Sequence, residues 1–168
     1  MNIVLTGYMA SGKTTVGKRL AELLNRPFAD TDAMVEEKAC MKIAEIFDKY
    51  GEKHFRMLEK AAVLEISQKD GFVVATGGGV VLDSENVSNL RKKGAVINLF
   101  PDDMVVYTRL KNDLTRPLVR LEDMSAILKR FEERKPYYND CDFQVRITRD
   151  TDAEYICSKI IEFLGDRL

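Results

Sequence analysis

The sequence lacks the features that mark several protein classes. No apolar run approaches the roughly 18 residues that a membrane-spanning helix needs, so we predict no membrane partner. The first residues, 1–7, carry no basic region and no long apolar stretch, which predicts that no signal peptide is present. The chain has no basic excess, since 26 Lys and Arg face 27 Asp and Glu, and such a balance is not typical of nucleic-acid binding. We therefore expect a cytoplasmic protein without a nucleic-acid partner.

Cysteine and histidine are scarce as well. Cys40, Cys141 and Cys157 are widely separated, and His54 is the single histidine. This argues against a Cys/His metal cage, and although a catalytic Cys–His pair stays open, free cysteines are more often small buried apolar residues. Linker-like stretches and repeats are also missing, which predicts one domain over residues 1–168. Because no interface signal is visible, we expect a monomer.

What is present is an alternation of short apolar and longer amphipathic segments. We predict strands at 2–6, 27–30, 72–76, 95–100 and 143–148. We predict helices at 12–24, 31–50 (in one or two pieces), 51–69, 84–93, 101–111 (with Pro101 in the first turn), 125–138 and 152–164. This alternation indicates an α/β fold with a parallel sheet that helices cover on both faces. Ligands of such sheets bind beyond the carboxyl ends of the strands.

The loop after the first strand carries a phosphate-binding motif. Residues 7–14 read GYMASGKT, which fits G-x-x-x-x-G-K-[ST] between a strand and a helix. Such a loop aims backbone N–H groups at phosphate oxygens, and the helix N-terminus adds partial positive charge. A plain glycine turn is the alternative, but the length and place of the motif favour nucleotide binding. The residues expected to bind the nucleotide here are Gly7, Met9, Ala10, Ser11, Gly12, Lys13, Thr14 and Thr15.

The motif does not name the reaction, and further absences narrow it. The chain has neither the N-K-x-D string with which GTPases read their base nor the L-S-G-G-Q string of ABC-type ATPases. It is also too small for the machinery of a mechanical ATPase. A small-molecule kinase is the class that remains.

Two further loops are candidates for the acceptor side. Asp30 and Asp32 follow the second strand, where one carboxylate could hold a metal and the other could orient an acceptor hydroxyl. The alternative is a helix N-cap, for which Asp is well suited, and the spacing does not decide between them. Gly77, Gly78 and Gly79 follow the third strand, and their bare backbone would let a ligand approach closely, unless they only form a flexible turn.

Three arginines are harder to judge from spacing alone. Arg56 and Arg134 could each be a solvated helix charge. Arg116 precedes Pro117, which disfavours a helix there and indicates a mobile, positively charged loop that could close over ATP.

The combination of these motifs resembles the shikimate kinases. The motifs appear in the family's order across essentially the whole chain: the phosphate loop, Asp30-Thr31-Asp32, Phe55-Arg56-x-x-Glu59, Gly77-Gly78-Gly79, Arg116-Pro117-Leu118 and Arg134-x-Pro136-x-Tyr138. The resemblance implies a three-layer α/β/α P-loop kinase fold with strand order 2-3-1-4-5, a substrate-binding helical region at about 31–60 and a lid at about 112–124. It implies transfer of the ATP γ-phosphoryl group to the 3-hydroxyl of shikimate, in aromatic amino-acid biosynthesis.

On the acceptor side, the resemblance assigns roles to individual residues. Asp32 would orient the attacking hydroxyl and serve as its base. Arg56 and Arg134 would clamp the shikimate carboxylate, a task that suits the planar guanidinium group, and Glu59 would buttress Arg56. The backbone of Gly77–Gly79 would complete the substrate-binding residues.

On the nucleotide side, the cofactors implied are ATP and Mg²⁺. Thr14 and Asp30 would hold the metal. Lys13 and Arg116 would stabilise charge on the transferring group, and Arg109 would pack against adenine.

Two departures from the family pattern concern the nucleotide. The family commonly has glycine where this chain has Ala10, and alanine is free of strain there only at negative φ. The segment 119–124 of the expected lid is short and contains no glycine. Two alternatives stay open: a gluconate- or nucleoside-monophosphate-type kinase, which would not need all of these motifs together, and a non-catalytic nucleotide-binding module. The intact Lys13, Asp30 and Asp32 argue against the module.

Overall fold

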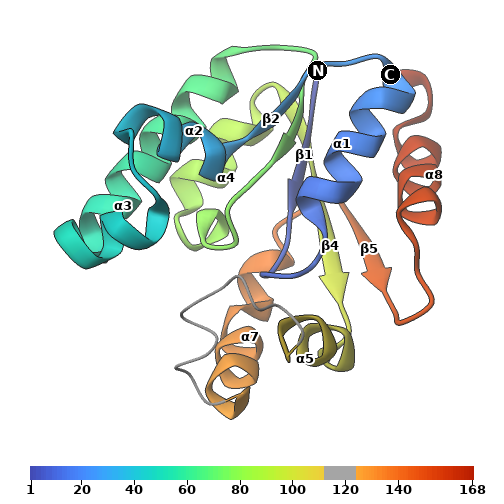
Figure 1. Cartoon of the computed structure of the whole chain (residues 1–168). Coiled ribbons are helices and arrows are strands. Elements are labelled where there is room, and N and C mark those ends of the chain that lie inside the picture. The colour runs from blue at the N-terminus through green and yellow to red at the C-terminus, as the bar shows by residue number, and fades with distance from the viewer. Residues whose placement is uncertain (112–123) are drawn as a thin grey trace.

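The computed structural model describes residues 1–111 and 124–168, and these build one parallel sheet flanked by helices (Figure 1). The sheet has five strands in the order β2-β3-β1-β4-β5, as predicted. Their bounds are β1 (Asn2–Thr6), β2 (Phe28–Asp30), β3 (Val73–Ala75), β4 (Gly94–Pro101) and β5 (Phe143–Ile147).

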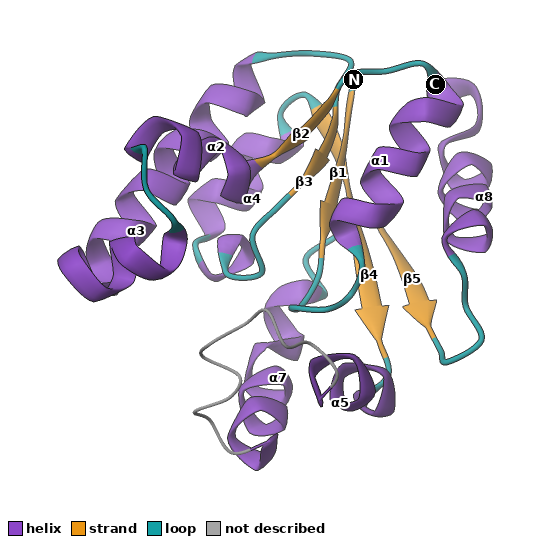
Figure 2. Cartoon of the chain, in the orientation of Figure 1, coloured by secondary structure: helices purple, strands orange, loops and turns teal. Residues whose placement is uncertain are grey.

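Helices cover both faces of this sheet (Figure 2). They are α1 (Lys13–Leu24), α2 (Thr31–Ala39), α3 (Ile43–Gln68), α4 (Ser84–Arg91), α5 (Asp103–Lys111), α7 (Met124–Tyr138) and α8 (Ala153–Leu164), with short 3₁₀ turns η1 (Val80–Leu82) and η2 (Gly165–Arg167). No helix within the described ranges is long and apolar enough to cross a membrane.

The alternation of side chains along β1 explains the two helical layers. Ile3 and Leu5 point to one face, where they pack in a core with residues of α1 and α8. Val4 points to the other face and packs with residues of α3 and α4. All three side chains are fully buried, as a strand covered on both faces requires.

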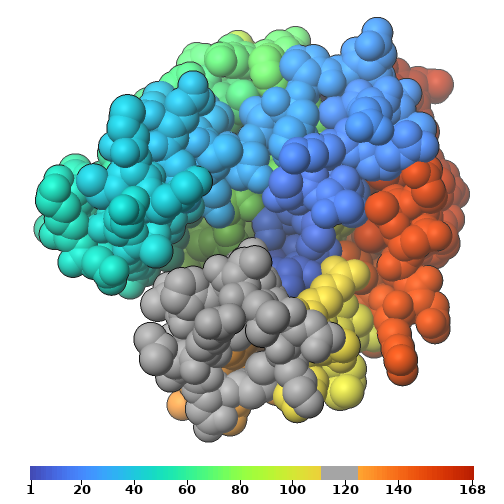
Figure 3. Space-filling view, viewed as in Figure 1, coloured from blue at the N-terminus to red at the C-terminus, as the bar shows by residue number. Residues whose placement is uncertain are grey.

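The strand register sets where the loops meet. Leu5 of β1 lies opposite Ala75 of β3, and Ala75 lies opposite Asp30 of β2, so the loops that follow these strands leave the sheet at the same level. Helices α5 and α7 lie beyond the carboxyl ends of β4 and β5 (Figure 1). In the space-filling view, α2 and α3 project to one side of the body that α1 and α8 form (Figure 3). The candidate site therefore lies at this edge of the sheet.

One detail of the sequence prediction changes. Pro101 does not open a helix: it ends β4 opposite Ile147, and the N–H of Asp102 continues the pairing by donating to the Ile147 carbonyl over 2.9 Å. Proline is tolerated at this end of a strand because the next residue supplies the missing donor. The predicted boundary at Gly51 is confirmed: α3 consists of two helical parts that meet in a kink at Gly51, whose φ of 77° and ψ of 172° are not helical.

Candidate nucleotide and acceptor site

The two glycines of the phosphate loop are both required by its shape. Gly7 has φ 146°, and a Cβ there would lie 2.5 Å from the Leu99 carbonyl oxygen. Gly12 has φ 93° and is the N-cap residue of α1. Only glycine adopts such conformations at little cost, and at Gly12 no side chain covers the first N–H groups of the helix. The loop therefore presents backbone donors without a side-chain cap at the positive end of the helix.

Lys13 folds back over this loop. Its Nζ donates to the Gly7 carbonyl at 2.7 Å, to the Tyr8 carbonyl at 2.9 Å and to Oγ of Ser11 at 3.2 Å. These bonds fix the ammonium group against the phosphate loop. A phosphate held by the loop would lie within its reach.

Ala10 does not have the negative φ at which alanine is free of strain. Its φ is 60°, in the left-handed region, which costs a residue with a Cβ on the order of 1 kcal/mol. Its carbonyl accepts a hydrogen bond from Nη1 of Arg109 at 2.8 Å. Burial lowers the pKa of Arg109. Arg109 thus lies against the loop, as expected of a residue near the nucleotide.

Asp30 is the N-cap residue of α2, and its second carboxylate oxygen faces the phosphate loop. Its Oδ1 accepts from the N–H groups of Asp32 and Ala33 and so caps α2, while its Oδ2 accepts from the hydroxyl of Thr14 at 2.9 Å. A hydroxyl and a carboxylate side by side are hard oxygen ligands of the kind that Mg²⁺ prefers. Within the described part of the chain, no group of three or more His, Cys, Asp or Glu side chains could hold a metal.

One cleft of about 860 Å³ collects most of the predicted residues. It is bounded by the phosphate loop, by the ends of β2 and β3, and by α5 and the start of α8. The predicted residues that line it are Met9, Ala10, Ser11, Gly12, Lys13, Thr14, Thr15, Asp30, Asp32, Gly78 and Arg109. The nucleotide-side and acceptor-side motifs thus share one space.

The glycine loop, Gly77–Gly79, packs against charged side chains of this protein. A Cβ on Gly77 would overlap Oδ1 of Asp32, and a Cβ on Gly79 would overlap the guanidinium of Arg56. Gly78 differs, because a Cβ there would have the backbone nitrogen of Met9 as its nearest neighbour at 3.5 Å, which is an ordinary contact. At two of the three glycines, a Cβ would therefore displace the end of a charged side chain, which the sequence could not show.

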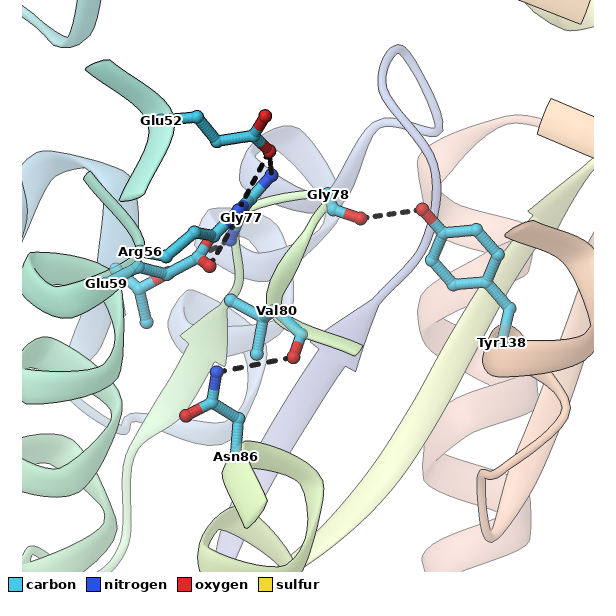
Figure 4. Close-up of polar contacts among 9 residues, drawn as sticks. Glu52, Arg56, Glu59, Gly77, Gly78, Val80, Asn86 and Tyr138 are labelled. Atoms are coloured by element: carbon cyan, nitrogen blue, oxygen red, sulfur yellow. Dashed lines mark hydrogen bonds and ion pairs between the residues drawn. The ribbon is translucent and has the colours of Figure 1, made fainter. Parts of the chain in front are cut away.

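Arg56 is held between two carboxylates on its own helix (Figure 4). Its Nη1 donates to Oε2 of Glu59 at 2.8 Å, and its Nη2 donates to Oε1 of Glu52 at 3.0 Å. Glu59 is 2% exposed, and its Oε1 has no hydrogen-bond partner among the described residues. Burial raises the pKa of Glu59, and the positive charges of Arg56 and Arg134 oppose this. Arg134 of α7 therefore faces the same cluster.

Comparison with known proteins agrees with this arrangement. The sequence model that describes shikimate kinases matches residues 9–165. The chain belongs to the shikimate kinase family.

Relatives within the family cover nearly the whole chain. The shikimate kinase of Caldanaerobacter subterraneus subsp. tengcongensis is 44% identical over 95% of this chain and 94% of its own length. The structure of shikimate kinase from Acinetobacter baumannii in complex with shikimate is 34% identical, with a TM-score of 0.90 over 99% of this chain and 93% of that one. The structure from Aquifex aeolicus is 32% identical, with a TM-score of 0.84 over 99% and 98%. The fold is therefore the P-loop kinase fold of these enzymes.

Within this family fold, the predicted residues do not all line one space. Most of the phosphate-loop residues line the main cleft with Asp30, Asp32, Gly78 and Arg109, whereas Arg56 and Gly79 line a smaller cavity of about 270 Å³. Arg116 and most of the expected lid, 112–124, lie outside the described residues. The roles assigned to individual residues stay predictions.

Sequence reasoning missed three contacts that shape the site. Glu52 binds Arg56, Oγ1 of Thr31 accepts from the N–H of Gly77 at 2.9 Å, and the hydroxyl of Tyr138 donates to the Gly78 carbonyl at 2.6 Å. Thr31 and Tyr138 were visible as members of motifs, but nothing in the spacing indicated their partners.

Proposed function

We propose that this chain phosphorylates the 3-hydroxyl of shikimate with ATP, giving shikimate 3-phosphate and ADP. The observation that carries the proposal is the contact between the phosphate loop and the glycine loop. Gly78 lies against the backbone of Met9, while Asp32 and Arg56 pack on Gly77 and Gly79. A nucleotide phosphate and an acidic, hydroxylated acceptor would thus meet across this contact.

Nucleotide binding rests on the phosphate loop and on Arg109. The backbone N–H groups and Lys13 would hold the phosphates, and Arg109 would lie beside the base. Thr14 and Asp30 would hold Mg²⁺, which would neutralise charge on the β- and γ-phosphates. Because Asp30 is fixed by its capping bonds to α2, its other oxygen, which accepts from the Thr14 hydroxyl, is pre-positioned for this task.

For the transfer itself, the acceptor oxygen attacks the γ-phosphorus as the bond to the β–γ bridging oxygen breaks. The bridging oxygen leaves with ADP, and the hydroxyl proton passes to the carboxylate of Asp32. Lys13 would stabilise the negative charge that spreads over the phosphoryl oxygens, and we assign the same task to Arg116.

Acceptor specificity would come from a carboxylate clamp. Arg56 is half-buried, and the pair of carboxylates around it fixes the plane of its guanidinium. Arg134 would approach from the other side, on α7. Two aimed guanidinium groups recognise a carboxylate with geometry as well as charge. We further propose, from the sequence, that the enzyme acts as a cytoplasmic monomer on small molecules alone.

The test is an assay of ADP release with purified protein, Mg²⁺ and ATP, in which shikimate, quinate, gluconate and AMP are compared as acceptors. We expect turnover with shikimate and little with gluconate or AMP. Turnover of gluconate or AMP in place of shikimate would support the alternative kinase class. No ADP release with any acceptor, despite ATP binding, would support a non-catalytic module.

A further inference from the structure

Tyr138 forms a hydrogen bond that joins two elements of the acceptor site. Its hydroxyl donates to the carbonyl oxygen of Gly78 over 2.6 Å, across 60 positions in the sequence (Figure 4). The side chain is 1% exposed and packs edge-on against Tyr8, with ring centroids 6.4 Å apart. A buried hydroxyl with a single well-placed acceptor fixes geometry more firmly than a solvated one.

The position of Tyr138 on α7 makes this bond relevant to Arg134. The two residues are four apart, so their side chains lie on one face of the helix. Pro136 lies between them and has no N–H to donate to the preceding turn. The last turn of α7 therefore lacks one backbone bond, and the Tyr138 hydroxyl connects this turn to the glycine loop.

The bond also orients the backbone of the glycine loop. The Gly78 carbonyl and the N–H of Gly79 belong to one planar peptide unit, so fixing the carbonyl fixes the direction of that N–H. Gly78 has no side chain to hold it, and its other close neighbours are backbone atoms of the phosphate loop. The loop would otherwise be free to rotate this peptide.

A second tyrosine anchors the opposite end of α7. The hydroxyl of Tyr8, in the phosphate loop, donates to the Ile127 carbonyl over 3.1 Å. Helix α7 is thus bonded to the phosphate loop near its start and to the glycine loop at its end. Burial raises the pKa of Tyr138, so its hydroxyl stays protonated, and a donor, at neutral pH.

We propose that Tyr138 is a positioning residue for the acceptor, because it holds Arg134 and the backbone of Gly78 and Gly79 in one fixed relation. This rests on the proposed function, in which both elements bind shikimate. Removal of the hydroxyl leaves the ring and its packing in place but releases the peptide and the end of α7. The effect should therefore fall on acceptor binding rather than on nucleotide binding.

The experiment compares Tyr138→Phe with Tyr137→Phe, a matched control in which the neighbouring ring is half exposed. Steady-state kinetics give kcat and the KM for each substrate, calorimetry gives the Kd for shikimate, and thermal melting reports folding. For Tyr138→Phe we expect the KM and Kd for shikimate to rise about tenfold, the loss that one unsatisfied buried acceptor can cause. The KM for ATP should stay within about twofold, and Tyr137→Phe should match the wild type throughout.

A double-mutant cycle with Arg134→Ala separates positioning from general weakening. If Tyr138 acts through Arg134, its effect on shikimate affinity should shrink when Arg134 is absent. A lower melting temperature with an unchanged KM and Kd for shikimate would overturn the proposal and leave Tyr138 a structural role. Absence of shikimate turnover in the wild type would instead reject the proposed function.

Discussion

The hydroxyl of Thr14 donates to the carboxylate of Asp30 over 2.9 Å, and the other oxygen of that carboxylate caps helix α2. One side chain thus connects the first turn of α1, where the nucleotide phosphates would lie, to the helix that carries Asp32. Capping would not compete with the proposed metal binding, because the two would use different oxygens.

Asp30→Asn separates these two tasks. Asparagine caps helices about as well as aspartate, so the melting temperature should change little, whereas loss of the charge weakens metal binding. We expect the Mg²⁺ concentration for half-maximal activity to rise about tenfold or more, by analogy with the loss of one charged ligand. Asp83→Asn is the control, since Asp83 caps α4 in the same way. An equal Mg²⁺ requirement in both variants would contradict the metal assignment.

Gly79→Ala tests the contact between the glycine loop and Arg56. Gly79 has φ −96°, which alanine adopts freely, so the only obstacle is the overlap of its Cβ with the guanidinium. Arg56 must move, and we expect the KM for shikimate to rise about tenfold, as for loss of a charged hydrogen bond. Gly78→Ala meets no such obstacle in the protein. Titration of shikimate should show the higher KM in Gly79→Ala. An unchanged KM in this variant would mean that Arg56 does not bind the acceptor.

Much of the site could be predicted from sequence because its signals are local. The strand, the loop and the helix from residue 2 to residue 24 follow from an apolar run, two glycines at fixed spacing and an amphipathic pattern. Asp30 and Asp32 could be placed near this loop because parallel strands end at one edge of a sheet. The structure agrees with each of these expectations.

The remaining features depend on contacts between distant residues or on backbone angles. The partner of Tyr138 lies 60 positions away, and no periodicity marks such a pair. The side chains that a Cβ on Gly77 or Gly79 would meet belong to α2 and α3, so these contacts could be seen only once the helices were placed. Pro101 reads as a helix start locally, but pairing with β5 holds it in the sheet.

Ala10→Gly should stabilise the protein. Alanine is strained at φ 60°, and glycine removes this strain but loses more backbone entropy on folding. The free energy of unfolding should therefore rise by about 0.5–1 kcal/mol. Urea unfolding measures it. Asn25→Gly, at φ 50°, is the matched control, and its gain should be smaller because asparagine tolerates this region. If Ala10→Gly proves less stable than the wild type, strain at this position is not the dominant effect.

Glu59 should give the protein an unusual pH dependence. Burial raises the pKa of its carboxyl above the ordinary 4.5, so in the folded chain it keeps its proton to higher pH than in the unfolded chain. Stability from this group therefore falls as the pH rises from about 4.5 through the folded pKa, and the loss is complete above it. Most paired carboxylates have a lowered pKa and add stability as the pH rises, so the sign of the pH dependence distinguishes the two cases.

Glu59→Gln removes this contribution while keeping an amide oxygen for Arg56. Melting temperatures are measured from about pH 4 to pH 8. At the acidic end, where Glu59 is protonated, the variant and the wild type should melt at nearly the same temperature. As the pH rises, the variant should become more stable relative to the wild type. Glu65→Gln is the control on the same helix: Lys38 lowers the pKa of Glu65, so that variant should lose slightly with rising pH, since exposed pairs contribute little. If the melting temperature of Glu59→Gln instead falls relative to the wild type as the pH rises, the ion pair with Arg56 outweighs burial. Glu59 then acts as an ordinary charged partner.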